Sequence, residues 1–193
     1  MNKIKLAGTI ESEITVFTKT TNGNLLEFYI SSKRNSGVED TLRVLAKEEL
    51  LVGYEKGDKI FISGEVKTRN KDGHLLIYIY AKEISDRKER DMDIVEIDGF
   101  ICSKKPIRTT TLTEQKIMDL MLAVNNENGS SYIPCIFWNK MAENFEDVEV
   151  GTELKLKGRL QSRAYVKFLS ETETEVRTAY ELSVFDVEKV EDK

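Results

Sequence analysis

Apolar and polar residues alternate along several stretches of this chain, and alternation with a period of two is typical of β-strands. The clearest stretch is residues 150–165, VGTELKLKGRLQSRAY. One side of the expected strand is apolar and consists of Leu154, Leu156, Gly158 and Leu160. The other side is polar and ends in an aromatic ring, with Lys155, Lys157, Arg159, Gln161, Arg163 and Tyr165. A glycine at the centre of the apolar side predicts a curled sheet in which another backbone comes close.

The same pattern occurs earlier, over residues 56–69. There Gly57 and Gly64 lie seven residues apart, as Gly151 and Gly158 do. Upstream, four apolar or glycine positions recur at a constant offset of 91 residues, in the pairs Ile4 and Val95, Leu6 and Ile97, Gly8 and Gly99, and Ile10 and Ile101. The chain is therefore interpreted as a tandem duplication. The charged stretch SDRKERDMD lacks apolar periodicity and predicts a linker, which divides the chain into a domain over 1–85, a linker over 86–93 and a domain over 94–193.

Each repeat is expected to hold five strands, with one short helix between the third and the fourth. In the first repeat the strands are expected at 3–13, 25–32, 41–46, 58–69 and 74–84, with a helix over 47–54. In the second they are expected at 94–103, 115–125, 131–138, 152–163 and 177–189, with a helix over 139–147. A longer loop over 164–176 is either a mobile arm over a groove or a tolerated insertion. This order predicts an all-β protein of tandem five-stranded OB barrels, although other small barrels share it.

Composition fits two folded domains. The 193 residues are 40% hydrophobic and include only two prolines. A net charge of −5 argues mildly against a nucleic-acid binder, but residues 1–90 hold 16 basic and 14 acidic side chains and residues 91–193 hold 13 and 20. Binding depends on local charge rather than on the sum. Many acids of the second repeat lie in 143–153, in 171–175 and in the C-terminal tail, which we expect to be away from the cationic side of 155–163.

Several classes of function are disfavoured. No apolar run is long enough to cross a bilayer and the N-terminus has no signal-peptide core, so we expect a cytoplasmic protein without a membrane partner. Cys102 and Cys135 lack metal-ligand spacing and are interpreted as small buried hydrophobes. The single histidine, His74, allows neither a histidine-based triad nor a histidine metal cluster, and no phosphate-cradling glycine motif occurs. We therefore expect no catalytic residue, no metal and no cofactor in a protein that is not an enzyme.

The second repeat resembles the bacterial single-stranded DNA-binding protein family, SSB. Residues 136–145, IFWNKMAENF, followed by VGTELKLKGRLQSRAY, are similar to the family's aromatic-ended third strand, its helix start and its glycine-containing fourth strand. Gly99, Pro106 to Arg108 and residues 120–124 add to the resemblance, whereas the first repeat matches more loosely. The resemblance implies largely sequence-independent binding of single-stranded DNA in replication, recombination or repair.

The family stacks bases on aromatic residues at both ends of the third strand and just past the fourth. By motif position these fall on Tyr132, Trp138 and Tyr165, with half-buried packing as the alternative role of Trp138 and ordinary sheet surface as that of Tyr132. The family contacts phosphates at the first turn, which here holds Lys104, Lys105 and Arg108. The fourth strand is expected to add phosphate contacts from Lys155, Lys157, Arg159 and Arg163.

The first repeat lacks these aromatic residues and is expected to bind more weakly or to serve assembly. Its candidate contacts are Arg43, Lys67, Arg69 and Lys71, and its tyrosines near them are Tyr29, Tyr78 and Tyr80. Tyr78 and Tyr80 form either an exposed aromatic pair or a subunit contact, and the contact is slightly favoured.

The resemblance also bears on assembly and on alternatives. The family wraps DNA around four OB folds, so two per chain imply a homodimer. The chain stops at VEKVEDK without the acidic, hydrophobic-ended tip that the family uses for recruitment, so no recruitment through a tail is expected and a plasmid, phage or specialised variant fits. The alternative function is an OB-fold protein-interaction module of a replication or conjugation complex with weak or no nucleic-acid binding. RNA is an alternative ligand, because stacking alone does not reject a 2′-hydroxyl.

Overall fold

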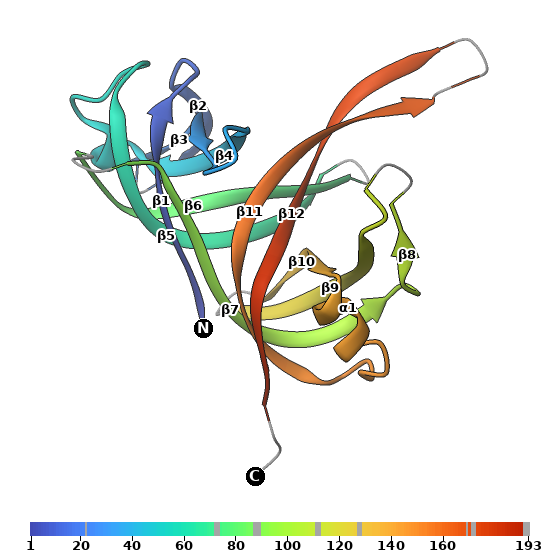
Figure 1. Ribbon diagram of the computed structural model, residues 1–193. Coiled ribbons are helices and arrows are strands. Elements are labelled where there is room, and N and C mark those ends of the chain that lie inside the picture. Colours follow the sequence, from blue (N-terminus) through green and yellow to red (C-terminus); the bar gives the residue numbers. More distant parts are fainter. Residues whose placement is uncertain are drawn as a thin grey trace.

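The computed structural model describes residues 1–21, 23–71, 74–86, 90–110, 113–126, 129–168, 170 and 173–190, without the side chain of Lys71. Residues 87–89 of the predicted linker and the last three residues of the tail lie outside these ranges. Nearly all regular structure is β-strand (Figure 1), as the alternation predicts.

The first half of the chain contains six strands and one turn of 3-10 helix. These are β1 (Asn2–Ile10), β2 (Thr15–Thr20), β3 (Gly23–Lys33), β4 (Glu39–Lys47), η1 (Glu48–Leu51), β5 (Lys59–Lys71) and β6 (His74–Asp86). The expected helix over 47–54 is reduced to η1. The expected first strand over 3–13 ends at Ile10, and the polar stretch after it forms β2, which pairs with β3 but is not one of the five expected strands.

The second half repeats this order with a short α-helix. Its elements are β7 (Met92–Lys104), β8 (Arg108–Thr109), β9 (Lys116–Asn126), β10 (Gly129–Trp138), α1 (Lys140–Asn144), β11 (Glu153–Phe168) and β12 (Thr174–Lys189). The expectation of a loop over 164–176 is wrong. The ladder between β11 and β12 continues to the pair Phe168 and Thr174, because strand-forming residues such as Val166 and Val176 face each other there. The result is a two-stranded ribbon that projects from the body of the protein (Figure 1).

Five strands of each half close into a ring. β1 pairs with β3 and with β5, β3 pairs with β4, and β5 pairs with β6; the parallel pair of β4 and β6 completes the circuit. In the second half β7, β9, β10, β12 and β11 close in the same way, again through one parallel pair. This is the strand arrangement of an OB barrel. The prediction of tandem five-stranded barrels with a short helix between the third and fourth barrel strands is therefore confirmed. We call the two circuits the first ring and the second ring.

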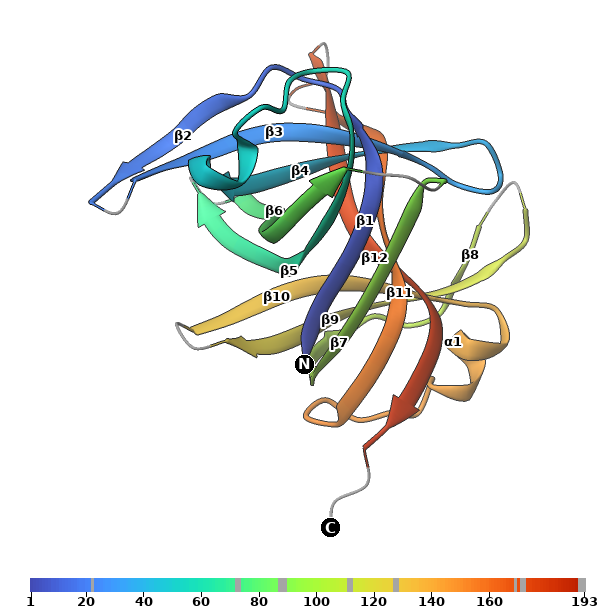
Figure 2. The same ribbon diagram turned by 90° about the vertical axis from the view of Figure 1, so that its left-hand side faces the viewer.

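The two rings share one continuous sheet. β1 and β7 run antiparallel from the pair Asn2 and Ile97 to the pair Ala7 and Met92 (Figure 2). Two side-chain hydrogen bonds at equivalent positions of the repeats also join the rings. The Tyr132 amide donates to Thr68 Oγ1 at 2.8 Å, and the Thr41 amide donates to Ser162 Oγ at 3.0 Å. The duplication thus produces a pseudo-symmetric pair of barrels whose contacts repeat along with the sequence.

Glycines lie where strands cross at close range. A Cβ atom on Gly158 would lie 2.6 Å from the Ser183 carbonyl oxygen, and one on Gly8 would lie 2.1 Å from that of Ser31. Gly64 and Gly99 make equally close approaches in the two rings. The apolar side of β11 is buried around Gly158, with Leu154, Leu156 and Leu160 in the core. The curled sheet expected from the central glycine is confirmed.

Gly158→Ala should lower the free energy of unfolding by about 1–3 kcal/mol, because the added methyl group forces β11 and β12 apart. Gly8→Ala should cost at least as much, since its contact is closer. Urea unfolding followed by circular dichroism measures both effects. A Gly158→Ala variant as stable as the wild type would contradict the close approach.

Candidate nucleic-acid interface

β10 separates core residues from the candidate aromatic residues. Ile133, Cys135 and Phe137 are buried, whereas Tyr132 is 47% exposed and Trp138 is half-buried on the opposite face. The alternation of a strand accounts for this division. Burial also raises the pKa of the Cys135 thiol. The expected burial holds for Cys135 but is wrong for Cys102, which is exposed because it is the extra residue where the register of β7 and β9 shifts.

Trp138 lies in a cleft that both rings line. We call it the Trp138 cleft; its residues include Trp138, Arg108, Gln161 and Arg163 of the second half and Arg34 and Val38 of the first. Trp138 Nε1 donates a hydrogen bond of 2.9 Å to Ser183 Oγ on β12, which fixes the indole ring. The cleft therefore brings together three of the predicted site residues, Trp138, Arg108 and Arg163.

The guanidinium groups of this cleft are held by carboxylates. Arg108 donates to both oxygens of Asp119 at 2.7 and 3.2 Å, and this hydrogen bonding raises the pKa of Arg108. Arg163 Nε lies 3.7 Å from Glu181 Oε1, which also accepts a 2.9 Å hydrogen bond from Gln161. Paired guanidinium groups keep a fixed direction and retain N–H groups that can bind phosphate.

Arg34 is a further member of the cleft that the sequence analysis missed. It forms a bidentate pair with Asp40, with both N–O distances 2.6 Å. Asp40 in turn accepts a 2.7 Å hydrogen bond from the Ser162 amide of the other ring. A cation of the first repeat is thereby placed beside the aromatic residue of the second.

Tyr165 lies on the projecting ribbon of β11 and β12. It is 37% exposed and pairs across the ribbon with Arg177. Because side chains alternate along β11, Tyr165 is expected on the same face as Arg163. It lies beyond the part of β11 that belongs to the second ring. The third candidate aromatic is therefore carried by the ribbon that replaces the expected loop.

The lysines of β11 lie among acids. Lys157 pairs with Glu96 of β7 at 2.9 Å, and this hydrogen bond raises the pKa of Lys157. Lys155 lies 4.0 Å from Glu188 of β12. The expectation that the acids lie away from this side is wrong here, because neighbouring strands bring in carboxylates from elsewhere in the chain.

The first turn of the second half carries Lys104, Lys105 and Arg108. The Lys104 ammonium donates to the Glu146 carbonyl oxygen, which draws this side chain toward the segment after α1. Lys105 is exposed, and its amide donates to the Asp119 carbonyl oxygen at 2.8 Å. Arg108 alone of these three lines the Trp138 cleft.

In the first ring two of the four candidate cations lie over tyrosine rings. Arg43 pairs with Glu27 and lies 5.7 Å from the centroid of Tyr29. Lys67 pairs with Glu65 at 3.2 Å and lies 4.7 Å from the centroid of Tyr80. These are cation–π contacts within the chain, so the two cations and the two tyrosine side chains are already each other's partners. Arg69 is exposed on β5, and the side chain of Lys71 is outside the described residues.

Tyr78 and Tyr80 face the second ring of the same chain. They line a cleft together with Asn125, Ser130 and Ser131. Desolvation raises the pKa of Tyr78. Both tyrosine side chains are thus partly covered within the chain, so less of their surface is available for contact with a second subunit.

Two closed barrels joined through β1 and β7, with a cleft that combines an aromatic ring and cations, define an OB-fold protein of the kind that contacts unpaired nucleic acid. The sequence model of the single-strand binding protein family matches residues 92–190, and the chain belongs to this family. No curated protein matches the sequence.

Solved structures show the same fold. The wild-type single-stranded DNA binding protein from Thermus aquaticus superposes with a TM-score of 0.79 at 20% identity, over 100% of this chain and 94% of that one. A deletion mutant of the same Thermus aquaticus protein gives a TM-score of 0.77 at 21% identity, over 100% and 96%. The similarity extends over both rings, including the first, whose sequence resembles the family less.

Among the described residues, no helix is long and apolar enough to span a membrane. In the same ranges, no three His, Cys, Asp or Glu side chains are grouped so as to hold a metal ion.

Proposed function

We propose that this chain binds single-stranded DNA without catalysis and with little sequence preference. The observation that supports this most directly is the Trp138 cleft, which a fixed indole ring lines together with Arg108 and Arg163. Unpaired bases would stack on Tyr132, Trp138 and Tyr165 while guanidinium groups contact phosphates. Stacking needs no hydrogen bonds to base edges, so the preference among sequences should be slight.

The candidate phosphate contacts differ in strength. We propose the main contacts at Arg34, Arg108 and Arg163, because they line the cleft that holds the aromatic ring. Lys155 and Lys157 should contribute less, since neither of them lines the Trp138 cleft. The remaining candidates are proposed as peripheral contacts: Lys104, Lys105, Arg43, Lys67, Arg69 and Lys71.

The biological setting is also a proposal. Family membership supports a role in replication, recombination or repair in the cytoplasm. We propose domains over 1–85 and 94–193, each built on one ring, and a homodimer that presents four OB folds. The strands that join the two rings of one chain, β1 and β7, lie inside the sheet, so the dimer would use other surfaces.

Titration of Trp138 fluorescence with oligo-dT tests the binding function. Trp138 is the only tryptophan, so bound bases should quench its emission strongly at low salt and less at high salt. If about four phosphates are neutralised, log affinity should fall against log salt with a slope near −3. An unchanged signal at micromolar oligonucleotide, together with no complex in a gel-shift assay, would contradict the proposal.

A protein-interaction module is the second candidate, and the ion pairs favour it. Glu96, Asp119 and Glu181 each lie against a cation that DNA would need. If the titration fails, a pull-down with replication or conjugation proteins is the next experiment.

A further inference from the structure

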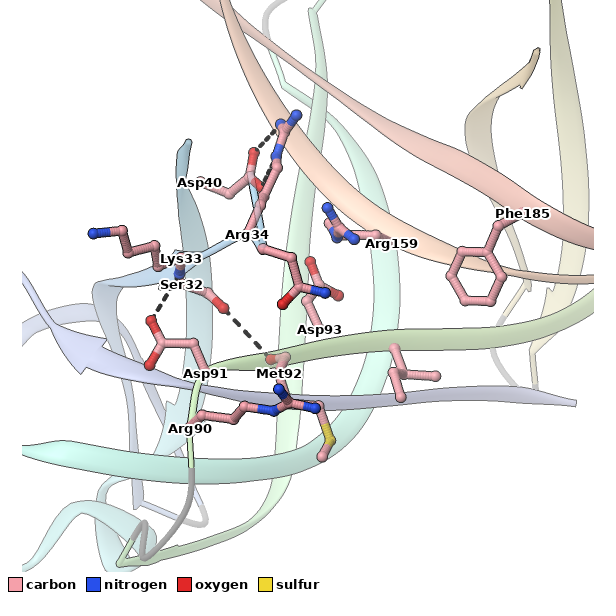
Figure 3. Close-up of a pocket in the computed structure, with 12 residues that line it drawn as sticks. Ser32, Lys33, Arg34, Asp40, Arg90, Asp91, Met92, Asp93, Arg159 and Phe185 are labelled. Atoms are coloured by element: carbon pink, nitrogen blue, oxygen red, sulfur yellow. Dashed lines mark hydrogen bonds and ion pairs between the residues drawn. The ribbon is translucent and has the colours of Figure 1, made fainter. Parts of the chain in front are cut away.

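A β-bulge directs an aromatic side chain into a second cleft. Gly158 pairs with Val184 whereas Lys157 pairs with Asp186, so Phe185 is the extra residue of β12. Bulges re-aim side chains, and Phe185 is 52% exposed. It lines a cleft between the rings, which we call the junction cleft, together with Arg34, Arg90, Asp93 and Arg159 (Figure 3).

The junction cleft has an excess of positive charge. Among the described residues, no carboxylate lies within ion-pair distance of Arg159, whereas Arg34 is held by Asp40. Asp93 lies near Arg159, and burial raises the pKa of Asp93 to about 8, so this carboxyl group is mostly neutral at pH 7. Lys33, Arg34, Arg90 and Arg159 line this cleft together with the carboxylates of Asp40 and Asp91. Figure 3 shows Arg159 and Phe185 projecting from β11 and β12 toward the same space.

The first ring provides an internal comparison. Its β5 and β6 carry the same bulge, where Ser63 pairs with Glu83 and Gly64 with Ala81, so Lys82 is the extra residue. Lys82 forms an ion pair with Glu65, which occupies the position of Arg159. The first ring thus has an ion pair between Lys82 and Glu65. At the equivalent positions the second ring has the exposed phenyl group of Phe185 and the unpaired guanidinium group of Arg159. This difference points to a ligand at the junction cleft.

We propose that the junction cleft is a second nucleotide subsite, in which one base of the bound DNA strand stacks on Phe185 and an adjacent phosphate contacts Arg159. The subsite rests on the proposed function. Arg34 lines both this cleft and the Trp138 cleft, so the two adjoin. Arg159 and Arg163 lie four residues apart on one side of β11, which corresponds to about 13 Å along the strand. A DNA strand that leaves the Trp138 cleft can therefore run along β11 and reach Phe185.

Phe185→Ala tests the subsite, with Phe100→Ala as the matched control. Phe100 is also an exposed phenylalanine, at 41%, but it lies beside Glu149 and Glu153 rather than beside arginines. Anisotropy of labelled oligo-dT of increasing length measures affinity. The wild type and Phe100→Ala should gain affinity once the oligonucleotide reaches the junction cleft. Phe185→Ala should lower the affinity roughly 5- to 150-fold, and only for these longer oligonucleotides. This change in affinity corresponds to the stacking of one base.

Two further measurements make the result decisive. Arg159→Gln should make the salt slope shallower by about 0.7, the effect of one phosphate contact on a single strand. An oligonucleotide that carries 5-iodouracil should crosslink to the peptide that contains Phe185. The subsite is wrong if Phe185→Ala matches the wild type at all lengths and no such crosslink forms, while Trp138 quenching persists. Loss of Trp138 quenching in the wild type would instead reject the proposed function itself.

Discussion

Replacing Trp138 and Tyr165 together by alanine should lower the affinity for oligo-dT by about 2–6 kcal/mol, because each ring is expected to stack on one base at about 1–3 kcal/mol. The two positions lie on different elements, β10 and the ribbon of β11 and β12. Their effects should therefore be close to additive. Since the double variant has no tryptophan, anisotropy of a labelled oligonucleotide is the measurement.

The conservative double variant, Trp138→Phe with Tyr165→Phe, is the control. It keeps both rings and should bind within about tenfold of the wild type, since one flat π surface replaces another. It also loses the hydrogen bond from Trp138 to Ser183, so it separates that contact from stacking, and thermal melting checks that each variant is folded. If the alanine variant binds as tightly as the phenylalanine variant, stacking on these rings is not the source of affinity. The protein-interaction module would then be the better account.

The sequence predicts the barrels because their determinants are local or periodic. Alternation along β11 identifies its buried side, and the repeated glycines mark strand crossings, where Gly8 and Gly158 permit approaches that a Cβ atom would block. The length of the ribbon was missed because residues 164–176 are mostly polar, as in a loop. A two-stranded ribbon exposed on both sides needs no apolar face, so its sequence carries little periodic signal.

The candidate site is only partly predictable, since cross-strand neighbours are not local in sequence. Lys157 is part of an apparent cationic side until β7 brings Glu96 against it. Arg34 gave no signal, because its place in the Trp138 cleft depends on how the two rings pack. The extra residue Phe185, by contrast, is detectable in the pattern of buried residues along β12. Val184 and Val187 both pack on the core although they lie three residues apart, and such a break in alternation marks one extra residue.

Asp93→Asn should stabilise the protein at neutral pH, by up to about 4 kcal/mol at pH 7. The equivalent position in the first repeat shows the reason. Asn2 occupies the equivalent position in the first ring, where its Nδ2 donates to the Val66 carbonyl oxygen at 2.8 Å and its Oδ1 accepts from the Val66 amide at 3.0 Å. Asp93 accepts from the Leu160 amide at 3.4 Å, and its buried Oδ2 has no partner. A carboxyl group has to take up a proton before it can donate there, whereas an asparagine amide carries the hydrogen at every pH.

The sign of the pH dependence follows from the pKa of Asp93. Burial, and secondarily the charge of Asp40, raise it from 3.8 to about 8, while the Leu160 amide and the nearby Arg159 and Arg34 oppose the rise. Between these values the folded protein keeps a proton that the unfolded chain has released. Its stability should therefore fall by at most about 1.4 kcal/mol per pH unit from pH 4 to pH 8 and then level off.

Urea unfolding of both proteins between pH 5 and pH 9 isolates this contribution, because the other titrating groups are shared and cancel in the difference. The advantage of Asp93→Asn should grow up to pH 8 and stay constant above it. Asn2→Asp is the reciprocal variant: it removes the donor to Val66 and should introduce a similar loss of stability with rising pH in the first ring. A difference between wild type and Asp93→Asn that is the same at pH 5 and pH 8 would show that Asp93 is ionised in the folded protein.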